Sequence, residues 1–429
     1  MLKYIKNKFI NNTIWLLADK CLKMILGFYV ITQLSRSLGP ENYGILSFSQ
    51  SIISIFIAIT SLGINFLVVE QLINSKNRDD TNIILGSIFI MRLFVGFICF
   101  FITIFLNLYF NNSESSEIII ILSIILLFEP LNIIDSFYQS KVKSKYIVIC
   151  TNLKFIIGSA AKLYAISHNF SLRNIAIIFL FESILQYVLY LLLYKLHGFS
   201  FFSWKPSVAK IKKLLHRTWP LALVAIFTNM YNRVDQVMLN SLLDNYSVGI
   251  YSAANKINEL FFFIPIVVSS SIFPLLVSKQ NTSSYIPTLL KVYKINFLIS
   301  LPVSILLFIF SEFLVLTIYG QQFNEAITIL KCLAITIVIK SINLVFVKYL
   351  YIEGLEKKYL KMSIIGFLIN IVLNFYLIRE FGIIGAALAT LSSLFITTFL
   401  FELFDSKLRK VYYLKIQWLL PINTNEKDE

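Results

Sequence analysis

NIILGSIFIMRLFVGFICFFITIFLN, residues 82–107, holds 26 positions and a single charged side chain, Arg92. A helix needs about 20 mostly apolar residues to cross the hydrocarbon core of a bilayer, so this stretch predicts a membrane-spanning helix. The whole chain of 429 residues has the same character, with 57% hydrophobic residues, 14% charged residues and a mean hydropathy of +0.77. In soluble domains, roughly 45–50% of the residues are hydrophobic and about 25% are charged. A water-soluble fold is therefore excluded.

Eleven further apolar runs have a comparable length, which gives twelve predicted spans. Strands of a membrane β-barrel would be about 10 residues long with alternating polarity, whereas these runs are longer and apolar on most faces. The sequence therefore predicts an all-α integral membrane protein. The predicted spans are 13–35, 44–72, 82–107, 117–137, 146–166, 174–194, 218–240, 248–277, 295–317, 326–352, 359–378 and 383–404.

The basic residues between the spans fall almost entirely on alternate connections. The N-terminus, the even-numbered connections and the tail hold clusters of Lys and Arg, whereas the other connections hold Arg36, Arg173 and Arg379. Lys and Arg accumulate in the cytoplasmic loops of membrane proteins, so both termini are predicted to be cytoplasmic. The net charge of +15 follows from this topology. The basic residues are spread over several connections and do not form the single basic stripe that a nucleic-acid-binding protein presents.

The chain contains an internal repeat. Leu38-Gly39-Pro40-Glu41-Asn42-Tyr43-Gly44-Ile45-Leu46-Ser47 aligns with residues 243–252 at a constant offset, since 249 − 44 = 205. Six spans precede the central connector and six follow it, which predicts parallel repeats related by an axis along the membrane normal. The predicted organisation is a six-helix lobe at 1–197, a connector with an interfacial helix at 198–217, a second six-helix lobe at 218–405 and a cytoplasmic tail at 406–429.

Polar side chains inside the predicted spans follow helical spacing. Such residues are costly in a membrane and usually face the interior of the bundle or a water-filled cavity. Cations in a cavity suit an anionic substrate, because Arg and Lys form charge-assisted hydrogen bonds with phosphate oxygens. The candidate substrate-binding cations are Arg233, Lys256, Lys23 and Lys20, and the candidate polar residues of the cavity are Asn229, Asn232, Gln236, Asn255, Ser51 and Ser54.

A second interpretation of the same charges is internal pairing. Asp19 and Lys23 stand at i,i+4, and Lys256 and Glu259 at i,i+3, which are spacings that place side chains side by side on a helix. Arg233 has no acid three or four residues away in the sequence, so its functional interpretation is the strongest.

The sequence predicts no enzymatic or metal chemistry. It has no Walker A loop, no GxSxG, no HExxH and no CxxC pair among its four cysteines, so no cofactor and no metal site are expected.

Three motifs resemble the polysaccharide transporter family, which includes the Wzx-type O-antigen flippases. They are the 38–44 segment quoted above, Tyr251-Ser-Ala-Ala-Asn-Lys256 in the eighth span, and Phe381-Gly-Ile-Ile-Gly-Ala-Ala-Leu-Ala389 before the last span. The resemblance covers almost the whole chain. It implies the fold of the multidrug and toxin extruders (MATE), with two six-helix lobes around a V-shaped cavity, and it implies cavity positions for Lys20 or Lys23 and for Lys256. The twelve predicted spans depart from the fourteen of lipid II flippases, which argues against peptidoglycan precursors as the substrate.

The resemblance also implies a multi-pass protein of the bacterial inner membrane. Its expected activity is to flip undecaprenyl-diphosphate-linked oligosaccharides, the units of O-antigen or a related surface polysaccharide, from the cytoplasmic to the periplasmic leaflet by alternating access. Its expected partners are that lipid, the bilayer and other polysaccharide assembly proteins, with a monomeric state and no nucleic acid. Asp19, Glu129 and Glu259 are the candidate carboxylates for coupling to an ion gradient.

Two other functions stay open at this point. A drug or cation antiporter of the same fold would want unpaired carboxylates, for which Asp19 and Glu129 are candidates, although basic residues outnumber acidic ones in the spans. A membrane polysaccharide polymerase or ligase would be expected to carry a large outer loop with paired arginines. The longest predicted outer loop, near 107–117, holds neither Arg nor Lys.

Overall fold

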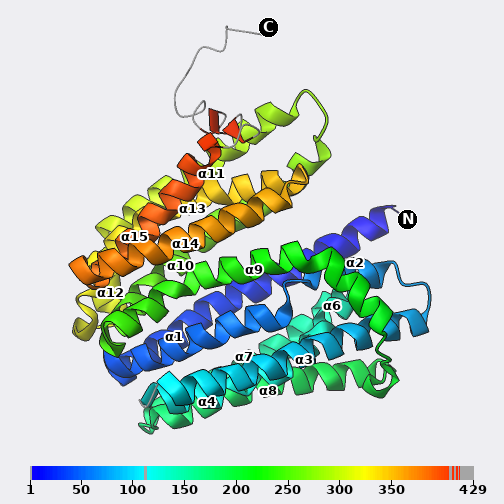
Figure 1. The fold of residues 1–429 in the computed structure, drawn as a ribbon, viewed down its shortest axis with the longest axis horizontal. Helices are drawn as coiled ribbons and strands as arrows, with labels where there is room; N and C mark the ends of the chain where they lie inside the picture. Colours follow the sequence, from blue (N-terminus) through cyan, green and yellow to red (C-terminus); the bar gives the residue numbers. More distant parts are fainter. Residues whose placement is uncertain (1, 111–113, 405–407, 410–411, 414, 416–429) are drawn as a thin grey trace. The chain divides into compact units, whose positions relative to one another are not determined.

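The computed structural model describes residues 2–110, 114–404, 408–409, 412–413 and 415, and within these ranges every regular element is a helix (Figure 1). The chain divides into two compact units, Met1–Val237 and Met238–Glu429, so the division falls within one long helix, α9 (Val208–Leu242). The lobe and connector boundaries predicted from the sequence stay a prediction.

The first helix, α1 (Leu2–Ser61), contains two predicted spans joined by a kink. Gly39 has φ 73° and ψ 171°, a backbone conformation open to glycine, and Pro40 follows it. The kink separates the predicted spans 13–35 and 44–72. The second of these was predicted too long as one helix, because Leu62 and Gly63 have positive φ and the chain restarts as α2 (Asn65–Ile73).

The next four predicted spans of the first unit are present, one of them broken. α3 (Arg78–Phe110), α7 (Ser144–Ser167) and α8 (Leu172–Leu196) are continuous. The predicted span 117–137 is instead divided into α4 (Glu114–Ser123), α5 (Ile125–Phe128), the 3₁₀ helix η1 (Glu129–Asn132) and α6 (Ile133–Ser140). Pro130 explains the interruption at η1, because proline lacks an N–H and crowds the preceding turn.

The basic segment of the predicted connector continues directly into the seventh span, and its interfacial position stays a prediction. After the short 3₁₀ helix η2 (Phe201–Ser203), α9 runs without a break from Val208 to Leu242 and takes Pro220 into its interior. At about 1.5 Å per residue such a helix is about 50 Å long, well beyond the roughly 30 Å of a hydrocarbon core. The basic segment is thus the continuation of a span.

The second unit contains the remaining predicted spans. Its first helix begins at the N-cap Asp244, whose side chain accepts a hydrogen bond of 2.7 Å from the Ser247 backbone N–H. The elements are α10 (Asn245–Ser278), α11 (Tyr285–Ile309), α12 (Ser311–Ile318), η3 (Gln321–Phe323), α13 (Ala326–Ile352), α14 (Glu356–Phe381), α15 (Ile383–Phe395), the π-helical turn η4 (Ile396–Leu400) and η5 (Phe401–Phe404).

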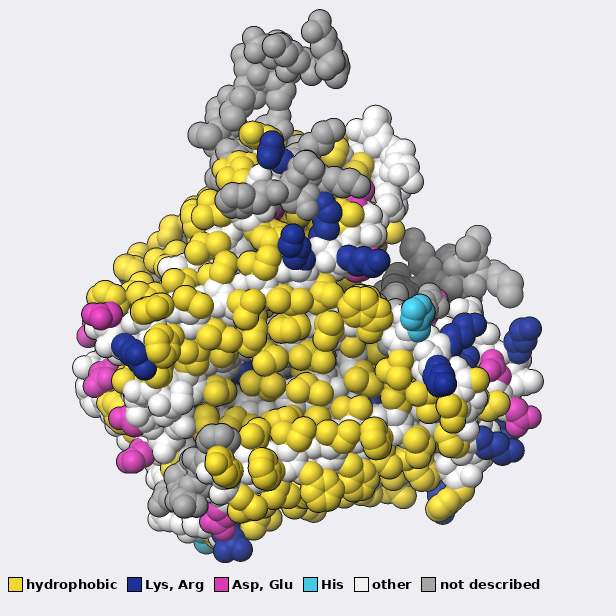
Figure 2. Space-filling model, viewed as in Figure 1, with side chains coloured by type: hydrophobic (Ala, Val, Ile, Leu, Met, Phe, Trp, Pro, Cys, Tyr) yellow, Lys and Arg dark blue, Asp and Glu magenta, His cyan; other side chains and the backbone are white. Residues whose placement is uncertain are grey.

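Ten helical segments within the described residues are long and apolar enough to cross a membrane. Two features account for the difference from twelve: one segment, Leu26–Ser61, covers parts of both predicted spans of α1, and α9 is too polar to qualify. Figure 2 shows hydrophobic side chains over most of the visible surface. A predominantly apolar surface is what a lipid-facing protein requires.

The chain after α15 is anchored in the second unit. Lys415 is fully buried, donates a hydrogen bond of 2.9 Å to the Thr398 carbonyl and pairs with Glu402, whose side chain is also fully buried. Burial lowers the pKa of the Lys415 ammonium, and the Glu402 carboxylate opposes that shift. Lys415, which belongs to the tail predicted at 406–429, therefore packs against the end of the last span.

Candidate substrate site

Two polar stripes that the sequence predicted on different helices meet in the first unit. Ser51 of α1 and Gln236 of α9 are both buried, and the Ser51 hydroxyl hydrogen-bonds with the Gln236 side-chain oxygen. Ser54, one turn further along α1, donates to the Ser51 carbonyl at 2.9 Å. The contact joins residues 185 positions apart in the sequence, so helical spacing identified both faces without showing that they touch.

Arg233 lies on the same side of α9 as this contact. Helical spacing puts Asn229, Arg233 and Gln236 on one face, at i, i+4 and i+7. Arg233 and Asn229 are half-buried, and the Asn229 side-chain oxygen is buried without a hydrogen-bond partner among the described residues, whereas Asn232 is exposed. This face of α9 therefore presents the Arg233 guanidinium and the Asn229 amide next to the hydrogen bond between Gln236 and Ser51.

Lys23 of α1 is half-buried, and its ammonium donates a hydrogen bond of 2.7 Å to the Thr151 hydroxyl of α7. Its charge also acts on Asp135 of α6. Neither partner was predicted. Asp19 and Lys20 belong to α1, but their side chains lie outside the described residues, so the predicted pairing of Asp19 with Lys23 stays a prediction.

In the second unit, the predicted ion pair between Lys256 and Glu259 is present at 3.5 Å. Asn255 donates to the same carboxylate at 3.3 Å. The side chains of Lys256 and Glu259 are 37% and 40% exposed. An ion pair so exposed is worth at most about 1 kcal/mol. Lys256 therefore stays accessible to another anion. Its convergence with Arg233 on one cavity stays a prediction.

Glu129 stands at the break before Pro130 and is deeply buried in the first unit. It is 2% exposed, and its Oε2 has no hydrogen-bond partner among the described residues. Arg92 of α3 is fully buried, donates from Nη2 to the Asn65 side-chain oxygen at 2.7 Å and leaves Nε and Nη1 without partners there. The two opposite charges act on each other without forming an ion pair in the described part of the chain.

A second charged cluster, between α7 and α8, was not predicted as a unit. Glu182 is buried, pairs closely with Lys162 and lies 3.5 Å from Lys154. A Cβ at Gly158 would lie 2.6 Å from the Glu182 carboxyl carbon, so glycine leaves room for that carboxylate. The spacing Lys154, Gly158, Lys162 was the available signal, because steps of four residues put all three on one helix face.

The Lys256 ion pair permits a test that separates substrate binding from charge neutralisation. If Lys256 binds a phosphate of the cargo that the family resemblance implies, we expect Lys256→Gln to lower export of surface polysaccharide by about tenfold, because a charge-assisted hydrogen bond is lost. We expect the double variant Lys256→Gln, Glu259→Gln to stay equally impaired. The measurement is surface polysaccharide in a deletion strain carrying each variant at matched membrane abundance. Recovery of export in the double variant would instead assign Lys256 to neutralising Glu259.

The long apolar helices and the apolar surface define a multi-pass membrane protein. Residues 9–280 match the family described as polysaccharide biosynthesis protein. This is more than half of the chain, which therefore belongs to that family. Residues 220–376 also match the family described as MatE.

Individual relatives agree with the family. The chain is 19% identical to a putative O-antigen transporter of Shigella flexneri over 429 residues, which covers 94% of this chain and 99% of the relative. It is 25% identical over 219 residues to Agl15, a probable low-salt glycan biosynthesis flippase of Haloferax volcanii, which covers 50% of this chain. The chain spans less than half of the length of Agl15, 46%.

Among solved structures, the lipid II flippase MurJ in an inward closed conformation is similar with a TM-score of 0.73 at 17% identity, which covers 98% of this chain and 94% of that protein. Similarity at this level of identity shows the fold, and the predicted all-helical membrane fold is confirmed. The two relatives above are named as a transporter and a flippase, which agrees with the prediction of a transporter rather than an enzyme.

Proposed function

We propose that the chain flips undecaprenyl-diphosphate-linked oligosaccharides from the cytoplasmic to the periplasmic leaflet of the bacterial inner membrane. The family match and the flippase and O-antigen transporter relatives support a lipid-linked glycan as cargo. Under this proposal both termini are cytoplasmic, as the distribution of Lys and Arg indicates. The protein works as a monomer alongside other proteins of polysaccharide assembly.

The observation that carries the proposal is the polar face of α9, with Arg233 next to the buried contact of Gln236 with Ser51. A diphosphate cannot cross about 30 Å of hydrocarbon without compensation for its charge. A guanidinium offers several donors in a fixed plane that matches phosphate oxygens. Arg233 and Lys256 hold the diphosphate, Lys23 and Lys20 add positive potential, and the lipid tail stays in the bilayer while the two halves rock.

Coupling to an ion gradient is assigned to Glu129 in this proposal, ahead of Asp19 and Glu259. Glu129 is buried with Oε2 unpartnered among the described residues, and it stands where the helix is interrupted, whereas Glu259 is exposed and paired with Lys256. A carboxylate in such surroundings can exchange a proton or a small cation when the helices around it move.

We expect Glu129→Gln to remove the dependence of flipping on an imposed ion gradient while leaving substrate binding intact. Glutamine keeps the shape of the side chain but cannot gain or lose a charge. The measurement is the flipping rate in proteoliposomes with and without a pH or sodium gradient. Glu117→Gln, an exposed change near the start of the neighbouring α4 that removes a surface ion pair with Arg173, is the control. A gradient response that persists in Glu129→Gln would remove Glu129 from coupling.

The experiment that tests the function itself is deletion of the gene. We expect surface polysaccharide to disappear while the lipid-linked oligosaccharide accumulates in the inner leaflet, where added glycosidase cannot reach it from the periplasmic side. Disappearance of polysaccharide without accumulation would place the chain elsewhere in the assembly process.

The match of residues 220–376 to the MatE family favours a drug or cation antiporter as the second candidate. It is distinguished by the same deletion strain. An antiporter predicts increased sensitivity to cationic drugs with unchanged surface polysaccharide, and Arg233→Ala would then not impair export of a cationic cargo.

A further inference from the structure

A pocket of about 490 Å³ opens in the first unit, away from the polar face of α9. It lies where the loop between α2 and α3 meets the end of α6 and the segment that follows α8. Its volume falls within the roughly 300–1,000 Å³ of small-molecule sites. By the predicted topology these connections are cytoplasmic. Neither the family match nor the sequence motifs assign a function to this pocket.

Three cations line the pocket: Lys76, Arg78 and Lys141. Within the described part of the chain none of them forms an ion pair. Two acidic residues nearby, Asp79 and Asp80, belong to the first turn of α3, where a negative charge is favourable. The Asp80 carboxylate also accepts a hydrogen bond of 3.3 Å from the Lys76 backbone N–H. Asp79 also lines the pocket, so three positive charges stand against one negative charge.

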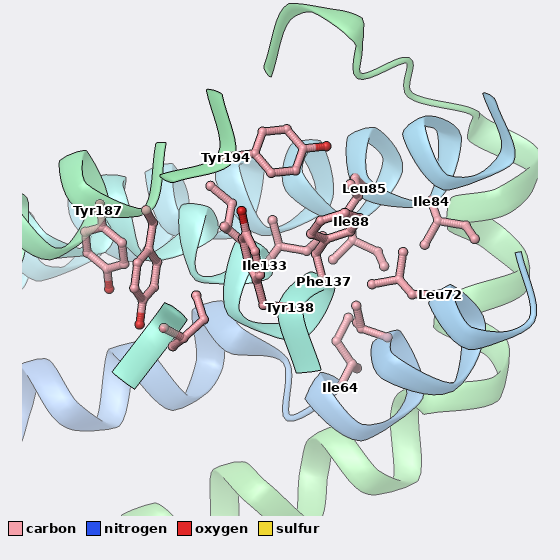
Figure 3. Packing of buried hydrophobic residues seen from close by; sticks show 14 of the residues in the cluster. Ile64, Leu72, Ile84, Leu85, Ile88, Ile133, Phe137, Tyr138, Tyr187 and Tyr194 are labelled. Atoms are coloured by element: carbon pink, nitrogen blue, oxygen red, sulfur yellow. The ribbon is translucent and has the colours of Figure 1, made fainter. Parts of the chain in front are cut away.

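The base of the pocket is a rigid group of rings. Phe137 and Tyr194 are 2% and 1% exposed and belong to the hydrophobic cluster that Figure 3 shows. Their centroids lie 5.3 Å apart, and Phe199 lies 5.0 Å from Phe137 and 5.1 Å from Tyr194. Arg78 stands 5.7 Å from the Phe199 ring centre. This cation–π contact holds the guanidinium at the wall of the pocket.

The rest of the lining supplies hydroxyl and amide groups, including Ser200, Ser203 and Asn77. We propose that this pocket binds a phosphate ester that carries hydroxyl groups, either the phosphate of a soluble sugar or the headgroup of an anionic phospholipid such as phosphatidylglycerol. The cations bind the phosphate oxygens by charge-assisted hydrogen bonds, and the hydroxyl and amide groups bind the ligand's hydroxyls. The proposal is independent of the substrate that the transporter flips.

Trp204 provides a reporter for this pocket. Its indole N–H donates to the Tyr194 hydroxyl at 3.1 Å, and its ring lies 4.8 Å from that of Phe201. The chain has four tryptophans, and replacing the other three, Trp15, Trp219 and Trp418, by Phe leaves Trp204 as the source of indole fluorescence. Isothermal titration of the unsubstituted chain gives an independent measurement should the triple replacement impair folding.

The purified protein in phosphatidylcholine nanodiscs is titrated with glucose 1-phosphate, and parallel nanodiscs contain increasing phosphatidylglycerol. We expect a saturable fluorescence change with at least one probe. Saturation by glucose 1-phosphate identifies a soluble ligand, and saturation by phosphatidylglycerol alone identifies a headgroup. No saturable response to either probe, by fluorescence or by titration calorimetry, overturns the proposal.

Matched variants locate the binding. We expect Lys141→Gln to weaken it about tenfold, because one charge-assisted bond is lost, and Asp79→Asn to strengthen it. Lys143→Gln removes the same charge from the same exposed loop but lies outside the lining, so it should leave affinity unchanged. If Lys141→Gln and Lys143→Gln lower the affinity equally, the binding is a general attraction of anions to a basic surface. That result would overturn the proposal that the pocket is a binding site.

Discussion

Gly385→Ala is expected to remove the folded protein from the membrane. Gly385 lies in the first turn of α15, where the chain has just reversed from α14 at Gly382. A Cβ at this position would lie 1.9 Å from the Leu377 carbonyl oxygen and 2.3 Å from its carbon. Both are backbone atoms of α14 and cannot turn aside as a side chain would. The two helices would have to separate, at a cost above the roughly 1–3 kcal/mol of ordinary overpacking.

The measurement is the amount of monodisperse protein extracted from membranes, followed by its thermal midpoint. Gly27→Ala is the matched control, because it adds the same methyl group to a helical glycine at 3.4 Å from the Phe155 ring, an ordinary contact distance. We expect the control to behave like the unsubstituted chain. Normal abundance and midpoint for Gly385→Ala would contradict the close approach of α14 and α15.

The spans could be predicted from the sequence because a bilayer imposes a length and a polarity on every helix that crosses it. The same argument misses local interruptions that leave the hydrophobic length unchanged. Pro130 divides a predicted span without shortening it, and the basic segment before Pro220 joins α9 because no residue there ends the helix. Both features concern the continuity of helices, which depends on backbone geometry more than on hydrophobicity.

The candidate site could be predicted only as separate helix faces. Spacing places Asn229, Arg233 and Gln236 together because one helix determines their positions, and it predicts the Lys256 pair for the same reason. The contact of Gln236 with Ser51 and the burial of Arg92 near Glu129 depend on how distant helices pack. A single sequence carries no signal for such packing.

Arg233→Ala is expected to lower export of surface polysaccharide by about ten- to a hundredfold, because a charge-assisted bond to a phosphate oxygen is worth roughly 1.5–3 kcal/mol. Arg233→Gln should be almost as impaired, since it keeps a polar group but loses the charge and the reach of the guanidinium. Arg233→Lys should retain part of the activity, because it keeps the charge and loses the planar arrangement of donors. This order is the signature of a bound anion.

The series is measured in the deletion strain at matched membrane abundance, together with the amount of lipid-linked oligosaccharide in the inner leaflet. Lys213→Gln is the control, because it removes one positive charge from the exposed basic end of the same helix, α9. A structural role for Arg233 predicts a different order, in which Gln is tolerated and the loss in Ala follows protein abundance. Export by Arg233→Gln at the level of the control would therefore remove Arg233 from the substrate site, because a shorter, uncharged amide cannot replace a guanidinium that holds a phosphate at low dielectric.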